Sequence, residues 1–344
     1  MSVPETMRAF VLTGHGDLDM LELRDDYPTP RPGPGEVLIG VEACGVNNTD
    51  VNTRIGWYSG GGWGGGLSFP LIQGADPVGR VVEVGDGVDP DLIGERVLVD
   101  AWIRGESLAD ARYLGSEVNG GFAEYVCVPS ANAHRIETPL TSVELAAFPC
   151  SYATAEHMLH RVGLERGQTV LVTGASGGVG TGLIQLARRR GARVIAVTSS
   201  PKVDAVSALG AEVVLDRTST DLATAIIAAS EGGVDVFADV VGGPGFASLF
   251  ETIRLGGQYV TAGAIGGPMV QLDLRTLYLR DITMHGATVL PPSVFDDLVG
   301  YIERGEVEPV VAATYHLEML RQAQSAFVDK DHIGAFVIEV GESE

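Results

Sequence analysis

One stretch, residues 169–180, constrains the fold of this chain more than any other part of its sequence. It reads Thr-Val-Leu-Val-Thr-Gly-Ala-Ser-Gly-Gly-Val-Gly, an apolar run with a glycine-rich turn, and leads into the helical pattern Leu-Ile-Gln-Leu-Ala-Arg at 183–188. Glycines let a backbone approach a pyrophosphate closely, and the amides of a helix N-terminus attract it. The next apolar run, at 192–198, supplies a second strand. This strand–turn–helix–strand context predicts a dinucleotide-binding unit.

The rest of the chain divides into two patterns. From about Tyr152, apolar runs alternate with helical stretches at 220–230 and 246–255, which predicts a doubly wound parallel sheet. The runs that follow the first two strands lie at 213–216, 234–239, 257–263 and 282–286. Residues 8–130 instead hold short β-branched runs between turn signals, at 37–43, 79–85, 96–100 and 122–128, and predict a β-rich region. The last fifty residues return to a mixed pattern, and we expect them to complete the first of two domains.

Charge and composition exclude several classes of partner. The net charge is −22, from 45 acidic and 23 basic side chains, which opposes binding to nucleic acid or to anionic membranes. No apolar run approaches the roughly 18 residues that span a bilayer, and the N-terminus has no apolar signal core. The three cysteines form no CxxC pair. We therefore expect a cytoplasmic protein that acts on a small-molecule substrate.

The end of the second strand indicates which dinucleotide binds. NAD sites usually carry an Asp or Glu about 20 residues past the glycines. Here the strand ends in Thr198, Ser199 and Ser200, followed by Pro201 and Lys202, so hydroxyls and a lysine replace the acid. Such groups suit a 2′-phosphate, and we expect NADPH rather than NADH. Ser200 and Pro201 also suit the start of a helix, and both interpretations can hold together.

Five motifs together resemble the medium-chain dehydrogenase/reductase superfamily, the group of alcohol dehydrogenases and quinone oxidoreductases. They are Pro34-Gly-Glu-Val-Leu-Ile, Cys44-Gly-Val-Asn-Asn-Thr-Asp50, Gly74-Ala-Asp-Pro-Val-Gly-Arg-Val-Val-Glu-Val-Gly85, Gly120-Gly-Phe-Ala-Glu-Tyr and Ala175-Ser-Gly-Gly-Val-Gly180. The resemblance covers nearly the whole chain. It implies a GroES-like β-barrel catalytic domain at 1–151 and 292–344, a Rossmann domain at 152–291, and an active site in the cleft between them.

With the strand-end residues above, the resemblance implies a set of cofactor-binding residues. They are Asn47, Thr154, Ala175, Ser176, Gly177, Gly178, Val179, Thr198, Ser199, Ser200, Lys202, Val241 and Ala264.

The same resemblance raises the question of a metal. Zinc-dependent members bind zinc through a cysteine, a histidine and a second cysteine, with a glutamate beside the histidine. This chain has Asn47, Ala75 and Cys150 at the three ligand positions, and Asp76 in place of the glutamate. A catalytic zinc needs about three protein ligands, so we predict that the protein works without metal. Two alternatives stay open: weak binding by Asp76 with Cys150, and a cluster of Glu156, His157 and His160 on one helix face.

Without zinc, the protein can reduce some hydride acceptors more easily than others. Hydride transfer to a simple ketone builds charge that a metal would stabilise, whereas an enone or quinone delocalises that charge. The segment Gly45-Val-Asn47 through Asp50, followed by Arg54, Gly56 and Tyr58, is similar to the zinc-free quinone oxidoreductase branch, and the Gly120 motif is similar to crotonyl-CoA-type enoyl reductases. We therefore predict an NADPH-dependent reductase of an activated C=C or quinone.

The catalytic candidates for this reaction are Asn47, Thr49 and Tyr58. Each also has a structural interpretation: Asn47 and Thr49 as partners of turn backbone, and Tyr58 as a wall residue. Two other functions stay open, an alcohol/ketone dehydrogenase with Thr49 as proton relay and a non-catalytic dinucleotide-binding paralogue. The apolar run at 282–290 predicts an edge strand that pairs with a second copy, so we expect a homodimer, with a tetramer as the alternative.

Overall fold

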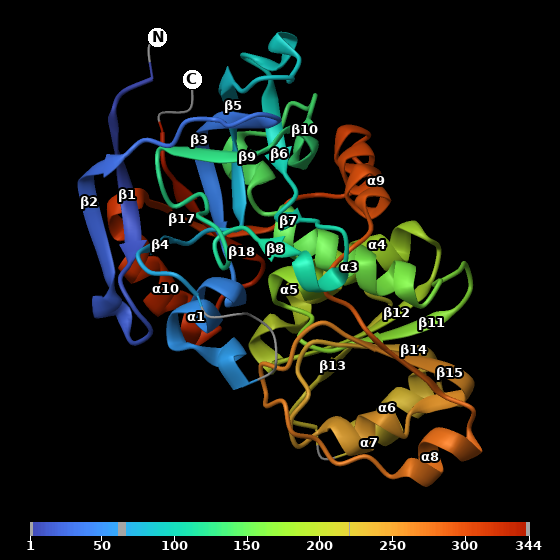
Figure 1. Ribbon diagram of the computed structural model, residues 1–344. Helices are drawn as coiled ribbons and strands as arrows, with labels where there is room; N and C mark the ends of the chain where they lie inside the picture. Colours follow the sequence, from blue (N-terminus) through green and yellow to red (C-terminus); the bar gives the residue numbers. More distant parts are fainter. Residues whose placement is uncertain (1–2, 61–66, 220, 342–344) are drawn as a thin grey trace. The chain divides into compact units, whose positions relative to one another are not determined.

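The computed structural model describes residues 3–60, 67–219 and 221–341 (Figure 1). The chain forms two compact units, Met1–Cys150 with Pro309–Glu344, and Ser151–Glu308. Residues 292–308, which we expected in the first domain, therefore lie with the second unit. The reason is the packing of α9 (Pro292–Glu303): the Arg189 guanidinium lies 3.5 Å from the ring centre of Tyr301 and pairs with Glu306 at 2.5 Å.

The first unit is built on β-strands. In its described residues the largest sheet has seven strands, in the order β10-β6-β5-β3-β18-β17, with β9 also paired to β3. These strands are β3 (Glu36–Val46), β5 (Asp76–Val84), β6 (Arg96–Val99), β9 (Tyr125–Pro129), β10 (Ala133–Arg135), β17 (Val311–His316) and β18 (Ala335–Glu339). β3 lies in the middle of this sheet, and its apolar side chains are buried. β18 pairs with β3, so the C-terminal residues complete this sheet as expected.

Smaller elements of the first unit surround that sheet. A three-stranded sheet has the order β2-β1-β4, and β7 pairs with β8. Their bounds are β1 (Thr6–Leu12), β2 (Leu21–Pro28), β4 (Leu71–Ile72), β7 (Trp102–Ile103) and β8 (Arg112–Tyr113), and the helices are α1 (Asn48–Ile55), α2 (Ser142–Leu145) and α10 (Leu320–Asp329). β8 lies inside the segment 103–120, whose polar sequence has no strand pattern.

The second unit contains a parallel sheet with the strand order β13-β12-β11-β14-β15-β16. This order is that of a doubly wound dinucleotide-binding sheet, as the strand–helix alternation predicted. The strands are β11 (Thr169–Val172), β12 (Arg193–Thr198), β13 (Val213–Asp216), β14 (Val234–Asp239), β15 (Ile253–Thr261) and β16 (Thr283–Gly286). The helices are α3 (Pro149–Arg161), α4 (Gly178–Arg189), α5 (Val203–Ala208), α6 (Leu222–Ala229), α7 (Phe246–Phe250), α8 (Leu274–Leu279) and α9.

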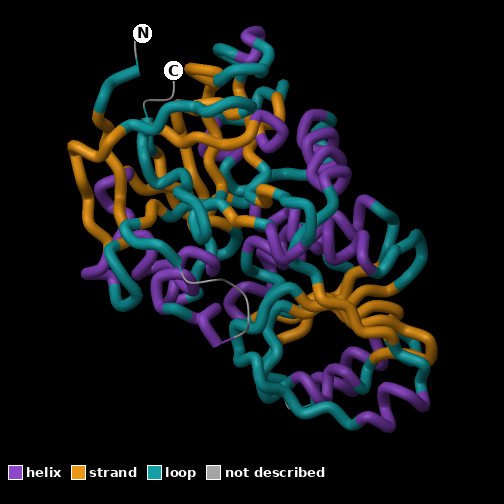
Figure 2. Tube along the Cα trace, viewed as in Figure 1, coloured by secondary structure: helices purple, strands orange, loops and turns teal. Residues whose placement is uncertain are grey.

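Helices cover both faces of this sheet (Figures 1 and 2). α4 packs on β11 and β12, and α6 and α7 lie on the opposite side. A buried core fills the second side, with Phe237, Phe246, Phe250 and Tyr259 at its centre. The helix that we expected to reach residue 255 ends at Phe250, because β15 begins at Ile253. No helix within the described ranges is both long and apolar enough to cross a membrane.

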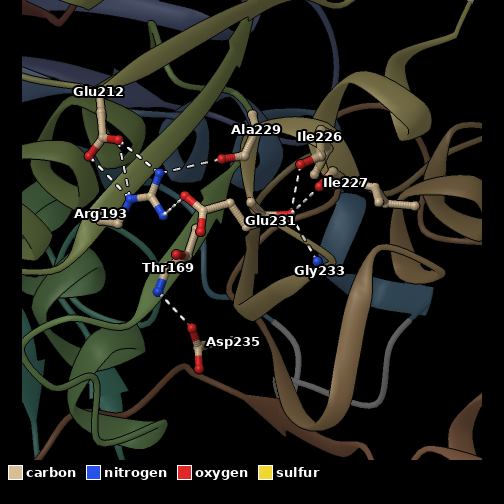
Figure 3. A network of polar contacts seen from close by, with 10 residues as sticks. Thr169, Arg193, Glu212, Ile226, Ile227, Ala229, Glu231, Gly233 and Asp235 are labelled. Carbon is tan, nitrogen blue, oxygen red and sulfur yellow. Dashed lines mark hydrogen bonds and ion pairs between the residues drawn. The ribbon is translucent and has the colours of Figure 1, made fainter.

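A polar network ties the strand starts together at one edge of the sheet (Figure 3). Arg193 at the start of β12 pairs with Glu212 at 2.9 Å and with Glu231 at 3.4 Å. Asp235 on β14 accepts a hydrogen bond of 2.7 Å from the Thr169 amide on β11. These contacts connect the amino ends of the strands. The glycine turn lies at the opposite edge, at the carboxyl end of β11.

Candidate active site

The glycine turn joins β11 to α4 at the carboxyl edge of the parallel sheet. Gly174 has φ of +61°, and a Cβ there would lie 2.8 Å from a Val240 methyl group. A Cβ on Gly180 would lie 2.2 Å from the carbonyl oxygen of Gly174. The N-cap of α4 is Gly177, which provides no side-chain cap, so the first helix amides are left to a ligand. The turn thus combines close backbone approach with the donors that a pyrophosphate requires.

The structure brings most predicted cofactor residues of the second unit to this edge. Ala175 is buried, and its amide donates to Val197 on β12 at 3.3 Å. Ser176, Gly177, Gly178 and Val179 are partly exposed along the turn. Thr154 lies on α3, whose Ser151 Oγ would be 2.2 Å from a Cβ on Gly178. Gly178 therefore also has a packing reason to be glycine.

Val241 and Ala264, two further predicted cofactor-binding residues, lie on loops that are joined by backbone hydrogen bonds. Val241 follows β14, and Ala264 follows β15. The amide of Gly266 donates to the carbonyl of Val241 at 2.7 Å, and the amide of Ile265 donates to Val240 at 3.2 Å. The two loops therefore form one continuous piece of the carboxyl edge.

The end of β12 carries an unsatisfied hydroxyl. Thr198 is buried, and its Oγ1 has no hydrogen-bond partner within the described residues. Ser199 and Lys202 are partly buried, and Ser200 is exposed. The Ser200 hydroxyl donates to Asp216 at the end of β13, and this bond lowers the pKa of the Asp216 carboxyl. The sequence around β12 does not predict that an acid lies here, because Asp216 belongs to the neighbouring strand β13.

In the first unit, the residues at the three zinc-ligand positions are connected through Asp76. The Asn47 side-chain amide donates to one Asp76 oxygen at 2.8 Å, and the backbone amide of Cys150 donates to the other at 2.9 Å. Asp76 is 2% exposed. Burial raises the pKa of Asp76 to about 8, although the bond from Asn47 opposes that rise.

A second buried carboxyl, that of Asp50, contacts the same part of the first unit. It accepts hydrogen bonds from the backbone amides of Asn47 at 2.7 Å and Gly74 at 3.1 Å. These bonds fix the start of α1 against the segment before β5. Burial raises the pKa of Asp50 to about 7. The sequence offered one signal for this role, because an acid three residues after Asn47 is the capping-box spacing.

The other two catalytic candidates also lie in this unit. Thr49 is in the first turn of α1, and its buried Oγ1 has no hydrogen-bond partner among the residues that the structure describes. Tyr58 follows the same helix and accepts a hydrogen bond from the Asn52 side chain at 3.3 Å. Burial raises the pKa of Tyr58, so its phenol stays protonated at neutral pH. All three candidates therefore come from residues 47–58.

One further residue of this region, Tyr113 on β8, was not among the sequence-based candidates. It is buried, its ring centre lies 4.7 Å from that of Trp102, and its hydroxyl is hydrogen-bonded to the Cys150 side chain. Burial raises the pKa of Tyr113 well above its ordinary value. The sequence signal for this contact is limited to the presence of an aromatic residue, Tyr113, in the largely polar segment 103–120.

The donor set of the first unit does not fit a catalytic zinc. Asn47 presents an amide that is already donating to Asp76, Ala75 presents a methyl group, and both Asp76 oxygens accept hydrogen bonds. No three His, Cys, Asp or Glu side chains within residues 3–60, 67–219 and 221–341 are grouped to hold a metal ion. Glu156, from the alternative cluster, is committed to a buried ion pair with Arg190.

The two raised carboxyl pKa values predict how stability varies with pH. Their unfolded value is 3.8, and the folded values are about 7 and about 8. Because the folded pKa is the higher one, this contribution to stability is complete below the unfolded pKa and is lost as pH rises through the folded values. The free energy of unfolding should fall between about pH 4 and pH 8. Urea unfolding across that range measures it.

Asp76→Asn should make this slope shallower than in the wild type, and Asp86→Asn serves as its control. The control removes the same formal charge at an exposed position and should keep the wild-type slope. Equal slopes in all three proteins would contradict the assignment.

Comparison with known proteins decides the family. One family model, described as an alcohol dehydrogenase GroES-like domain, matches residues 33–138, and another, described as a zinc-binding dehydrogenase, matches residues 178–304. A Sinorhizobium meliloti protein named provisionally as an alcohol dehydrogenase has a solved structure with a TM-score of 0.94 and 48% identity, over 98% of each chain. The chain belongs to the medium-chain dehydrogenase/reductase superfamily. The expected GroES-like and Rossmann domains are thereby confirmed.

Relatives within the superfamily are oxidoreductases of different kinds. Acryloyl-coenzyme A reductase of Metallosphaera sedula is 29% identical over 96% of this chain and 99% of its own length. NAD-dependent alcohol dehydrogenase of Sulfurisphaera tokodaii is 31% identical over 92% of this chain and 95% of its own. This protein is therefore an oxidoreductase of a family whose members use a nicotinamide dinucleotide.

Proposed function

We propose that this protein is a zinc-independent, NADPH-dependent reductase that delivers hydride to an activated C=C or to a quinone. The hydrogen bond between Asn47 and Asp76 carries the proposal, because it places a neutral amide and a buried carboxyl group where a zinc-dependent relative would carry a metal ligand. An acceptor that needs Lewis-acid polarisation is poorly served by that pair, and one that delocalises its own charge needs only hydrogen-bond donors.

The first unit supplies such donors. The Asn47 side chain has two N–H groups and uses one on Asp76, so the second is available to an acceptor oxygen. The Thr49 hydroxyl is buried without a partner in the described structure. Tyr58 holds a proton at its phenol oxygen. These groups stabilise the negative charge on the acceptor oxygen and return a proton to the product.

The carboxyl edge of the second unit fits a dinucleotide. The bound cofactor supplies a hydride to the acceptor. The turn from Ala175 to Val179 offers backbone amides for the pyrophosphate, and Thr198 offers an orphan hydroxyl beyond it. Val241 and Ala264 line the same edge on their paired loops.

The preference for NADPH depends on Lys202 and is opposed by Asp216. A charge-assisted hydrogen bond to phosphate contributes about 1.5–3 kcal/mol, which is roughly tenfold to a hundredfold. Lys202→Ala should therefore lower the NADPH/NADH ratio of kcat/KM by about tenfold or more. Asp216→Asn should raise the same ratio, because it removes a negative charge beside Ser200. Unchanged ratios in both variants would contradict the proposal.

An acceptor panel and metal analysis test the function itself. Chelator-treated protein should oxidise NADPH with enones, quinones or acyl-CoA alkenes, and should contain little zinc. The acryloyl-coenzyme A reductase among its relatives supports an acyl-CoA alkene as one acceptor class. The relatives named as alcohol dehydrogenases favour the second candidate, an alcohol/ketone dehydrogenase. One bound zinc per chain with turnover of simple alcohols would establish that candidate, and dinucleotide binding without turnover would indicate a non-catalytic paralogue.

We also propose that the protein forms a homodimer through β16. This strand is the edge of the parallel sheet, and apolar side chains around it are exposed: Met269, Leu274, Tyr278, Leu279 and Met284. The strong net negative charge opposes association elsewhere, whereas this edge offers backbone groups and apolar area to a second copy. Leu279→Asp with Met284→Asp should convert the dimer to monomer in sedimentation analysis. A monomeric wild type would contradict the proposal.

A further inference from the structure

Asp239, the last residue of β14, is a buried carboxyl that none of the steps above uses. It is 1% exposed. Its Oδ1 accepts hydrogen bonds from the Thr173 hydroxyl at 2.5 Å and from the Val241 amide at 2.9 Å, and the Gly242 amide lies 3.2 Å and 3.1 Å from Oδ1 and Oδ2. The Tyr259 hydroxyl donates to Oδ2 at 3.1 Å. Four donor groups from three neighbouring strands and the loops after them therefore converge on one side chain.

These contacts join the three loops of the carboxyl edge. Thr173 directly precedes Gly174, whose missing side chain leaves room for Val240 and Val241. The two glycines that follow Val241 have positive φ, +61° and +68°, a conformation that glycine adopts without strain and that lets the chain turn sharply at this point. The second of them, Gly243, donates its amide to Gly267 on the loop after β15 at 3.0 Å. Asp239 and these contacts thus connect all three loops.

The opposite end of β14 provides a natural comparison. Asp235 is also buried, at 5% exposure, and it also links β14 to β11, through the Thr169 amide at 2.7 Å (Figure 3). It lies at the amino edge of the sheet, where it contacts Thr169 and Arg254 on the opposite side from the three loops. Both aspartates link β14 to β11, but at opposite edges of the sheet. A change at Asp235 therefore tests stabilisation of the sheet, and a change at Asp239 also tests organisation of the binding edge.

We propose that Asp239 is a positioning residue that sets the dinucleotide-binding edge by fixing the Val241–Gly242 backbone against the glycine turn. This inference rests on the proposed binding of a dinucleotide by the second unit. The carboxylate acts as a shared acceptor: without it, two partly buried amides and two buried hydroxyls lose their partner, and the loops relax away from the conformation that the ligand needs. An acceptor oxygen is the required feature, and the negative charge is not.

Direct binding of NADPH, measured by calorimetry without turnover, tests this role. Asp239→Leu keeps the size of the side chain, removes both acceptors and should raise Kd by about tenfold or more. Asp239→Asn keeps the oxygen that serves Thr173, Val241 and Gly242, while Tyr259 can accept from the new amide, so Kd should stay within about threefold of wild type. Asp235→Leu, the matched control, should lower Tm with a wild-type Kd. Hydrogen exchange at Val241 and Gly242 should accelerate only in Asp239→Leu.

Other outcomes would overturn the inference. A wild-type Kd in Asp239→Leu, or the same loss in Asp235→Leu and Asp239→Leu, would mean that Asp239 serves only the fold. If Asp239→Leu does not fold, Thr173→Val and Tyr259→Phe take its place: each removes one donor to Asp239, and wild-type Kd values in both would likewise contradict the role. A wild type that binds neither NADPH nor NADH would overturn the proposed function, and this inference with it.

Discussion

A double variant, Asn47→Cys with Ala75→His, should bind one zinc ion per chain where the wild type binds none. Together with the native Cys150 the two changes supply three N/S ligands, which is the number that a catalytic zinc site takes from protein. The Asn47 side chain and the Cys150 backbone amide already bond to opposite oxygens of Asp76, so these two residues lie beside the same carboxyl group. Metal analysis after dialysis measures the stoichiometry. Free zinc at a hundred times Kd should also stabilise the variant by about 2.7 kcal/mol.

A third change provides the control for this gain. Adding Cys150→Ser to the double variant leaves two strong ligands, and zinc should then be lost on dialysis. Zinc retained equally with and without Cys150 would place the metal elsewhere on the chain. Failure of the double variant to bind zinc would contradict the view that these positions form a metal site converted to a hydrogen-bonded pair.

Gly180→Ala should cause the second largest effect, loss of dinucleotide binding together with reduced stability. The added Cβ would lie 2.2 Å from the Gly174 carbonyl oxygen and 2.6 Å from the Ala175 Cα, and both obstacles are backbone. Overpacking of this kind costs about 1–3 kcal/mol, and the turn can only relieve it by moving. Because that turn offers the pyrophosphate its amides, Kd for NADPH should rise at least about tenfold.

Gly245→Ala is the matched control for this prediction. Gly245 is also at the start of a helix of the second unit, has φ of −74° and would place its Cβ with no atom within 4 Å. Its Kd and Tm should equal those of the wild type. If Gly180→Ala also binds NADPH with wild-type affinity, the turn is not the pyrophosphate site.

The order of strands and helices and the glycine turn could be predicted from the sequence, because neighbouring residues determine them. The strand–turn–helix around Gly174 and Gly180 carries its own signals, because conformational freedom and periodicity are properties of neighbouring residues. The resemblance to the superfamily likewise assigns Asn47 and Ala75 to zinc-ligand positions from their place in the sequence. Boundaries were less secure: α7 gives way to β15 at Ile253, since sheet pairing overrides a helical periodicity.

The contacts that organise the site could not be predicted from one sequence. Asn47 and Asp76 are 29 positions apart, Asp76 and Cys150 are 74 apart, and Thr173 and Asp239 are 66 apart. Nothing in the spacing of such residues specifies a pair, because the fold alone brings them together. For the same reason the sequence around β12 does not predict Asp216 as an acid near the end of that strand: Asp216 reaches Ser200 from the adjacent parallel strand β13.

Transfer of label from NADPH deuterated at the nicotinamide C4 is the sharpest test of zinc-independent hydride delivery to an activated alkene. Chelator-treated protein is incubated with the labelled cofactor and an α,β-unsaturated thioester or enone, and the product is analysed by NMR. We predict a saturated product with one deuterium on the β-carbon, formed at a rate that added zinc does not change. Label found only on the carbonyl carbon of a simple ketone, and only when zinc is present, would contradict the proposed reaction.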